Sequence, residues 1–229
     1  MAWHAKPSGA YNYKSDEAKD NFIEFHSILS SYGFNDMAVC GIWSNIYIES
    51  GFNPFRWQSD TVNYSGGYGL PQFTPATSYI GGVGVGVDGY APNLSTSEWT
   101  TGASATDGKA QSIVMAEDRA GKFINRSSYC NWFDISYLYP LSNFKNADTV
   151  YHATIGWFFH YEGSAIALSG TASQQKTQCR LRYTAGKYAY KEWLGLDPGE
   201  SGERPPNWLF AKQMFTHYIM RNMGRSPFI

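Results

Sequence analysis

The sequence is poor in charge of either sign. Charged residues make up 16% of the 229 residues, and the basic and acidic side chains nearly balance, which leaves a formal net charge of -1 at pH 7. Such a chain has no strong electrostatic field to attract a nucleic acid or another acidic polymer. We therefore expect no nucleic-acid partner.

Long apolar runs are missing as well. No stretch approaches the roughly 20 apolar residues that a membrane-spanning helix needs. The first residues, from Met1 to Lys6, lack the apolar segment of a signal peptide. The sequence thus predicts neither a membrane span nor a signal peptide.

Cysteine is scarce and odd in number. Cys40, Cys130 and Cys179 cannot all pair within one chain, and their spacing does not match a metal site. Free buried thiols are the default expectation, and one disulfide remains open. His152 and His160 also lack partners at metal-ligand spacing, so we expect no metal and no cofactor.

Apolar and aromatic residues are abundant, at 43% and 17% of the chain. They suit one globular domain with an extension, or two small domains. Apolar periodicity predicts helices at 15–33, 37–48, 107–125, from Asn146 or Asp148 to Gly163, and 173–193. We place a helical domain at 1–194. Residues 195–206 read as a linker and 208–223 as a last helix, so 195–229 is a possible docking extension.

The helix expected at 37–48 organises the rest of the chain. Asn35 can cap its start, and its apolar positions recur in steps of three and four that continue to Glu49. Gly51 ends the helix, which puts Glu49 in the last turn on the apolar face. Because desolvation disfavours a charged carboxyl, this position predicts a raised pKa for Glu49, as a general acid needs at neutral pH. The alternative is an edge residue that is solvated or paired with an arginine.

A glycine-rich segment follows this helix. The glycines within 64–69 permit a tight turn, and Gln72 lies in a short extended stretch between two apolar residues. We expect a small β-hairpin that folds back over the helix end. It would present Tyr68 and Gln72 to a polar ligand near Glu49.

Two motifs carry a family resemblance. Glu-Ser-Gly-Phe-Asn-Pro at 49–54 and Gly-Tyr-Gly-Leu-Pro-Gln-Phe-Thr-Pro at 67–75 together resemble the signature of goose-type lysozymes, lytic transglycosylases and the phage tail lysozyme family. The preceding Gly-Ile-Trp-Ser-Asn at 41–45 is most similar to the tail lysozymes. The resemblance is strong over 37–80, weaker to about Leu194, and absent beyond. It implies a mainly α, α+β lysozyme-like fold: a helical domain with a small β-hairpin lining a substrate cleft.

The resemblance also implies an activity. Glu49 would act as general acid on the β-1,4 bond between N-acetylmuramic acid and N-acetylglucosamine in peptidoglycan, and tail lysozymes imply hydrolysis with inversion. A lytic transglycosylase that gives 1,6-anhydro products is one alternative. A non-catalytic, glycan-binding structural tail protein is an alternative of another class.

A tail lysozyme implies a place as well. We expect the protein in the virion, at the phage tail tip or knob, acting at the host cell wall during genome entry. Its partners would be peptidoglycan glycan strands and other tail proteins. The missing signal peptide agrees, since phage assembly followed by lysis is a route out of the cell.

Four more residues are candidates for the site. Inverting glycosidases place a second carboxylate ~6.5–9.5 Å from the acid, and Asp60 is the first candidate, with a solvated loop residue as its alternative. Trp57 could stack on a sugar or pack in the core. By resemblance, Tyr161 would hydrogen-bond toward Glu49 or the substrate. Glu162 would be a structural salt-bridge partner or a second acid, and we favour the structural role.

Overall fold

The structure is a computed structural model that describes residues 3–95, 102–103 and 107–197. Over these residues it is mainly helical, which confirms the expected fold class. All of the described residues belong to one compact unit. The predicted docking extension lies outside the described residues from position 198 onward, and the division at 194 stays a prediction.

The main helices are α1 (Asp16–Ser31), α2 (Asp36–Ser50), α3 (Asp107–Ala116), α4 (Leu141–Phe144), α5 (Val150–Trp157), α6 (Ala165–Ser169) and α7 (Ala172–Tyr188). Short helical turns are η1 (Gln58–Asp60), η2 (Ala76–Ser78), η3 (Tyr79–Val83), η4 (Ser127–Tyr129), η5 (Ser136–Leu138), η6 (Phe158–Glu162) and η7 (Ala189–Trp193). Two short strands, β1 (His4–Ala5) and β2 (Gly102–Ala103), pair antiparallel. None of the described helices is both long and apolar enough to cross a bilayer.

Helix α2 is the central element of the fold. The Asn35 side chain caps it by accepting from the Ala38 amide, and Gly51 ends it in the left-handed conformation, both as expected. Residues 38–46 are all buried, so this part of α2 has no solvent-facing side. Helices α5 and α7 pack against α2, and α1 packs beside it.

Close backbone contact fixes α7 against α2. A Cβ atom at Gly186 would lie 2.0 Å from Ser44 Oγ and 2.3 Å from the carbonyl oxygen of Cys40. Only glycine allows the helices to approach this closely. Arg182, one turn before Gly186 on the same face, is thereby directed toward the end of α2.

Two predicted boundaries were wrong. Helix α3 ends at Ala116 rather than near 125, because Asp118 turns the chain at φ 49 and its carboxylate accepts from the amides of Lys122 and Phe123. Helix α5 is capped by Thr149, not by Asn146 or Asp148.

The expected β-hairpin is reduced to isolated antiparallel bridges. The segment after α2 forms turns held by isolated antiparallel bridges between Trp57 and Tyr68 and between Tyr68 and Phe73. No named strand is assigned between these residues.

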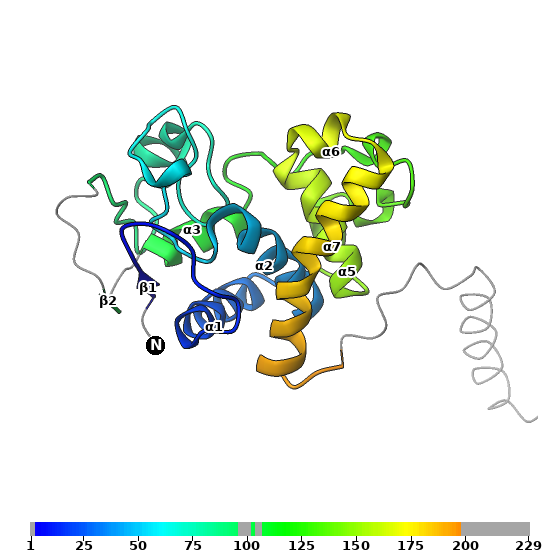
Figure 1. The fold of residues 1–229 in the computed structure, drawn as a ribbon, viewed down its shortest axis with the longest axis horizontal. Helices are drawn as coiled ribbons and strands as arrows, with labels where there is room; N and C mark the ends of the chain where they lie inside the picture. Colours follow the sequence, from blue (N-terminus) through cyan, green and yellow to red (C-terminus); the bar gives the residue numbers. More distant parts are fainter. Residues whose placement is uncertain (1–2, 96–101, 104–106, 198–229) are drawn as a thin grey trace, which may run out of the picture. The chain divides into compact units, whose positions relative to one another are not determined.

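Two lobes rise above the end of α2 (Figure 1). The first lobe, residues 52–95, contains the turns η1 to η3. The second lobe, within residues 122–171, contains η4, η6 and α6, which contact one another. Asp107 at the start of α3 anchors the first lobe, because its carboxylate accepts from the hydroxyls of Tyr68 (2.9 Å) and Tyr79 (2.7 Å).

Candidate active site

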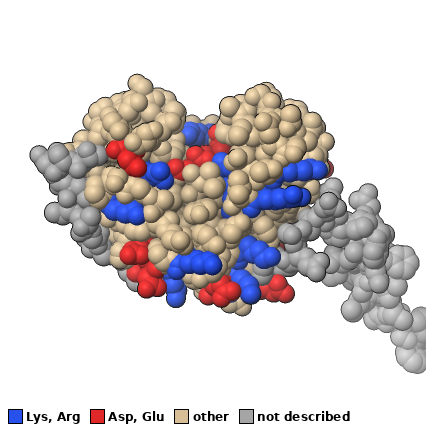
Figure 2. All heavy atoms as spheres, in the orientation of Figure 1, with Lys and Arg blue, Asp and Glu red and all other residues tan. Residues whose placement is uncertain are grey.

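A pocket of about 450 Å³ lies between the two lobes. Figure 2 shows the surface hollowed at this place, with acidic and basic atoms on the floor of the hollow. The first lobe contributes polar side chains, and the second lobe and α2 contribute charged ones. The lining residues are Glu49, Gln58, Gln72, Thr74, Lys122, Arg126, Tyr161, Glu162 and Ser164.

Glu49 lies at the end of α2 and faces this pocket with 23% of its side chain exposed. Its Oε1 accepts from Nη2 of Arg182 at 2.9 Å, and the Arg182 side chain is only 4% exposed. The guanidinium also lies over the Phe158 ring, 4.6 Å from its centre. The arginine partner considered for Glu49 is therefore present, and the carboxyl still lines the pocket.

Glu162 brings a second carboxyl into the pocket. It ends η6, and its Oε1 accepts from Nε1 of Trp157 at 3.2 Å. Burial, and then repulsion from Glu49, raise the pKa of Glu162 to about 8, while Lys122 and Arg182 oppose that shift. Sequence reasoning favoured a structural role for this residue, whereas the structure puts it in the pocket that Glu49 lines.

Tyr161 also reaches the pocket. Its ring stacks on Trp157 with centroids 4.1 Å apart, and the residue is 1% exposed. Within the described part of the chain its hydroxyl has no hydrogen-bond partner. A buried hydroxyl without a partner loses free energy that a ligand group could restore.

Gln72 holds the turn of the first lobe at the pocket. Its backbone is at φ 48, and its side-chain amide donates to the carbonyls of Arg56 (3.1 Å) and Gly69 (2.9 Å). The side-chain nitrogen is thus used inside the turn, while the residue still lines the pocket. Lys122 links the lobes, because its Nζ lies 5.6 Å from the ring centres of both Phe73 and Tyr161.

Tyr68 and Trp57 are not among the residues that line the pocket, which corrects their assignment as substrate-binding residues. Both are 0% exposed. The Tyr68 hydroxyl donates to Asp107 and accepts from the Asn93 amide at 2.8 Å, while Trp57 Nε1 donates to the Asn93 carbonyl at 3.1 Å. Core packing, the alternative reading for Trp57, is what the structure shows for both rings.

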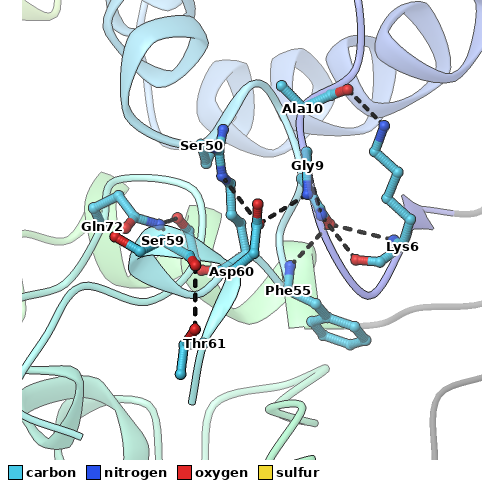
Figure 3. A network of polar contacts seen from close by, with 12 residues as sticks. Lys6, Gly9, Ala10, Ser50, Phe55, Ser59, Asp60, Thr61 and Gln72 are labelled. Atoms are coloured by element: carbon cyan, nitrogen blue, oxygen red, sulfur yellow. Dashed lines mark hydrogen bonds and ion pairs between the residues drawn. The ribbon is translucent and has the colours of Figure 1, made fainter. Parts of the chain in front are cut away.

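Asp60 is not brought to the pocket either. Its carboxylate accepts from the Gly9 amide at 2.8 Å and lies 3.6 Å from Nε of Arg56. Figure 3 shows Asp60 directed at Gly9 in the N-terminal arm. It anchors that arm, and Glu162 is instead the carboxyl that shares the pocket with Glu49.

Comparison with known proteins identifies the family. The sequence model of the phage tail lysozyme family matches residues 20–192. The chain belongs to the phage tail lysozyme family. The matched range includes Glu49, Gln72, Glu162 and Arg182, so the whole pocket lies within the family domain.

One relative of this family member is Morphogenesis protein 1 of Bacillus phage B103. The two sequences are 47% identical over 49 residues, which is 21% of this chain and 13% of that protein. The match thus spans a small part of the relative, and it likens this chain to a phage protein without assigning the relative's role to it.

The chemistry that this pocket offers is that of carboxyl groups. Among the residues that the structure describes, no three His, Cys, Asp or Glu side chains are placed to hold a metal ion. Glu49 is ion-paired with Arg182, whereas burial and the charge of Glu49 raise the pKa of Glu162, so the two carboxyls have different surroundings. A pair of carboxyl groups facing one cleft is the set of groups that most glycosidases use.

The sequence held a signal for the place of Glu162, whose structural role it favoured, but none for Arg182. Glu162 comes directly before Gly163, and Glu49 comes two residues before Gly51. Both glycines end a helix in the left-handed conformation, at φ 54 for Gly163 and φ 55 for Gly51. The repetition of a glutamate before a helix-ending glycine marked both pocket carboxyls. Nothing local marked Arg182, which lies 133 residues from Glu49.

Proposed function

We propose that this chain hydrolyses the glycan strands of bacterial peptidoglycan at the β-1,4 bond between N-acetylmuramic acid and N-acetylglucosamine. One observation carries the proposal: Glu49, Gln72 and Tyr161, from three separate segments, line one pocket between two lobes. The volume of about 450 Å³ is in the range of pockets that bind small ligands or parts of larger ones. Membership of the lysozyme family supports the choice of peptidoglycan.

Glu49 is the residue we propose as the essential catalytic carboxyl. Cleavage of a glycosidic bond needs a proton on the leaving oxygen and an anion near the positive charge that develops on the sugar. The pocket contains two carboxyls for these tasks. A second carboxyl also favours hydrolysis over transglycosylation, because it can hold or activate a water molecule, which the transglycosylase reaction does not use.

We further propose that the protein belongs to the phage virion and acts at the host wall during genome entry. The family name and the likeness to a phage morphogenesis protein support this proposal. Residues from 195 onward would dock on another tail protein. Deleting them should then leave wall cleavage intact and abolish incorporation into particles, whereas normal incorporation would contradict the docking role.

Clearance of a wall suspension tests the enzymatic proposal. Glu49→Gln should lower the clearance rate by at least ~100-fold, the usual effect of losing an acid or base group. Glu192→Gln is the matched control, because that side chain is 47% exposed and forms an ion pair with its neighbour Lys191, outside the pocket. Wild-type protein that clears nothing, or Glu49→Gln that clears as fast as wild type, would leave only a glycan-binding tail protein.

A further inference from the structure

Lys122 brings into the pocket a positive charge that no ion pair engages within the described residues. The residue is half-buried and lines the pocket, and among those residues its Nζ has no hydrogen-bond partner either. We propose, on the basis of the function above, that Lys122 determines substrate specificity. Its ammonium group binds a carboxylate on the O3 substituent of muramic acid, and it thereby selects which of the two alternating sugars occupies this part of the pocket.

The backbone of Lys122 is held on both sides. Its amide donates to the Asp118 carboxylate at 2.8 Å, and its carbonyl accepts from the Ile124 amide at 3.0 Å and from Nη1 of Arg126 at 3.4 Å. Arg126 in turn packs on Gly163, where a Cβ atom would lie 2.6 Å from Cζ of the arginine. The lysine side chain therefore extends from a hydrogen-bonded turn, which limits the positions that its ammonium group can reach.

Two aromatic rings from opposite lobes flank this ammonium group. Nζ lies 5.6 Å from the ring centre of Phe73 in the first lobe and 5.6 Å from that of Tyr161 in the second. Both distances are within the ~6 Å over which a ring face attracts a cation. Because Lys122 is half-buried between these rings, a carboxylate that reaches it interacts more strongly than it would in bulk water.

Two other cations near the pocket are engaged within the protein. Nη2 of Arg182 pairs with Glu49 at 2.9 Å. Nη1 of Arg126 donates to backbone carbonyls of η6, one of them at 3.2 Å. The cation that is left to bind an anionic group of a ligand is Lys122.

The carboxyls of the pocket do not pair with Lys122 either. Glu49 accepts from Arg182, and Glu162 accepts from Nε1 of Trp157 at 3.2 Å. Lys122 attracts Glu162 from a longer distance and opposes the rise in its pKa. Balancing that charge is the alternative role for Lys122, and the two roles predict different ligand preferences.

A second donor without a partner lies on the same side of the pocket. The Tyr161 hydroxyl is buried and has no acceptor within the described residues. The first lobe instead contributes the neutral side chains of Gln58, Gln72 and Thr74 to the lining. An anionic acceptor therefore fits the second-lobe side of the pocket, and neutral sugar groups fit the first-lobe side.

The glycan strand carries one group that matches this arrangement. Both of its sugars have acetamido and hydroxyl groups, but muramic acid alone has a lactyl ether on O3, which ends in a carboxyl. Where the strand has no peptide, this carboxyl is ionised. Where a peptide is attached, acidic residues of the peptide supply the carboxylate. In both cases the charge marks muramic acid and not N-acetylglucosamine, so Lys122 can distinguish the two sugars.

Three ligands separate the charge of this substituent from its shape. They are the disaccharide N-acetylglucosaminyl-N-acetylmuramic acid, its uncharged lactyl methylamide, and its form with an alanyl-glutamate dipeptide on the lactyl group. NMR titration of the full-length protein gives the Kd of each. Wild type should bind the free acid, the dipeptide form or both at least ~10-fold more tightly than the methylamide, because a hydrogen bond to a charged group contributes this much. Tight binding of the free acid assigns the lactyl carboxylate, and tight binding of the dipeptide form alone assigns the peptide.

Substitutions at Lys122 test whether it reads the charge. Lys122→Met should bring the ratio of Kd values between uncharged and charged ligands close to one, and Lys122→Arg should keep part of the preference. Lys191→Met is the matched control and should keep the wild-type ratio, because Lys191 is 64% exposed and pairs with Glu192 outside the pocket.

Two results would overturn the assignment. One is wild type that binds the methylamide as tightly as both charged ligands. The other is Lys122→Met that keeps the wild-type ratio, including the case in which it weakens all three ligands by one factor, as a charge-balancing role predicts.

Cleavage separates this proposal from the function on which it rests. Wild type that prefers the charged ligands and cleaves no peptidoglycan would refute the hydrolase and leave Lys122 its role in binding. Wild type that cleaves peptidoglycan without this preference would refute the role of Lys122 alone.

Discussion

Replacing Glu162 by glutamine should stabilise the protein at alkaline pH. The pKa of Glu162 is about 8 in the folded chain, against an ordinary value of 4.5. Between these values the folded chain keeps a proton that the unfolded chain has released. The free energy of unfolding of the wild type therefore falls as the pH rises through this window, and above about pH 8 the full penalty is present.

The size of the effect follows from the two pKa values. One pKa unit corresponds to about 1.4 kcal/mol, so a rise from 4.5 to about 8 sets an upper bound of about 5 kcal/mol. Because Glu162 is half-buried, solvent screens part of this penalty, and we expect about 2–4 kcal/mol at pH 9. Glutamine keeps the size of the side chain, and its amide oxygen can still accept from Trp157.

Urea unfolding followed by tryptophan fluorescence measures this difference. Wild type and Glu162→Gln should have similar free energies of unfolding near pH 5, and the variant should gain steadily from pH 6 to pH 9. Glu192→Gln should follow the wild type at each pH. A constant difference between Glu162→Gln and wild type across this range, or a wild type that is more stable at pH 9, would refute the reasoning.

Three further predictions concern the supports of the site. Gly186→Ala should lower the free energy of unfolding by about 3 kcal/mol, measured in urea, because its Cβ would overlap Ser44 and separate α7 from α2; an unchanged midpoint would contradict this packing. Asp107→Asn should lower the free energy of unfolding by about 1–3 kcal/mol, measured by thermal unfolding, because it places an amide NH₂ among hydroxyl and amide donors. A stability equal to wild type would argue against the role of Asp107 in anchoring the first lobe. Tyr161→Phe should leave the free energy of unfolding equal or raise it by up to about 1 kcal/mol, because the hydroxyl has no partner within the described residues. It should lower kcat/KM on peptidoglycan about tenfold, because a bound ligand would offer that hydroxyl a partner. An unchanged kcat/KM would remove Tyr161 from the site.

Local chemistry made part of the site predictable. The cap at Asn35 and the left-handed Gly51 lie within a few residues of the helix ends that they set, so the bounds of α2 and the place of Glu49 followed from the sequence. Gln72 followed from the glycine-rich turn around it. These features depend on neighbours in the chain, and the motif resemblance rests on the same residues.

The rest depended on contacts between distant segments. The burial of Trp57 and Tyr68 comes from Asp107 and Asn93, and an aromatic side chain in a polar loop gives no sign of such partners. Arg182 reaches Glu49 only because Gly186 lets α7 approach α2. Glu49 therefore has a guanidinium partner that the local pattern of α2 could not predict.

Asp60 shows the limit of reasoning by proximity in the chain. It was the nearest carboxylate after Glu49 in the sequence, but its side chain accepts a hydrogen bond from the Gly9 amide of the N-terminal arm. Glu162 is far from Glu49 in sequence and near it in space, because adjacent helices end at one pocket. Which carboxyl shares a site is decided by helix packing, not by distance along the chain.

Mass spectrometry of digested peptidoglycan tests the central claim most directly. Wild-type protein should release fragments that end in a reducing N-acetylmuramic acid, and Glu49→Gln should release almost none. Fragments that end in 1,6-anhydro-muramic acid would contradict hydrolysis and assign a transglycosylase, and reducing fragments from Glu49→Gln at the wild-type rate would contradict the role of Glu49.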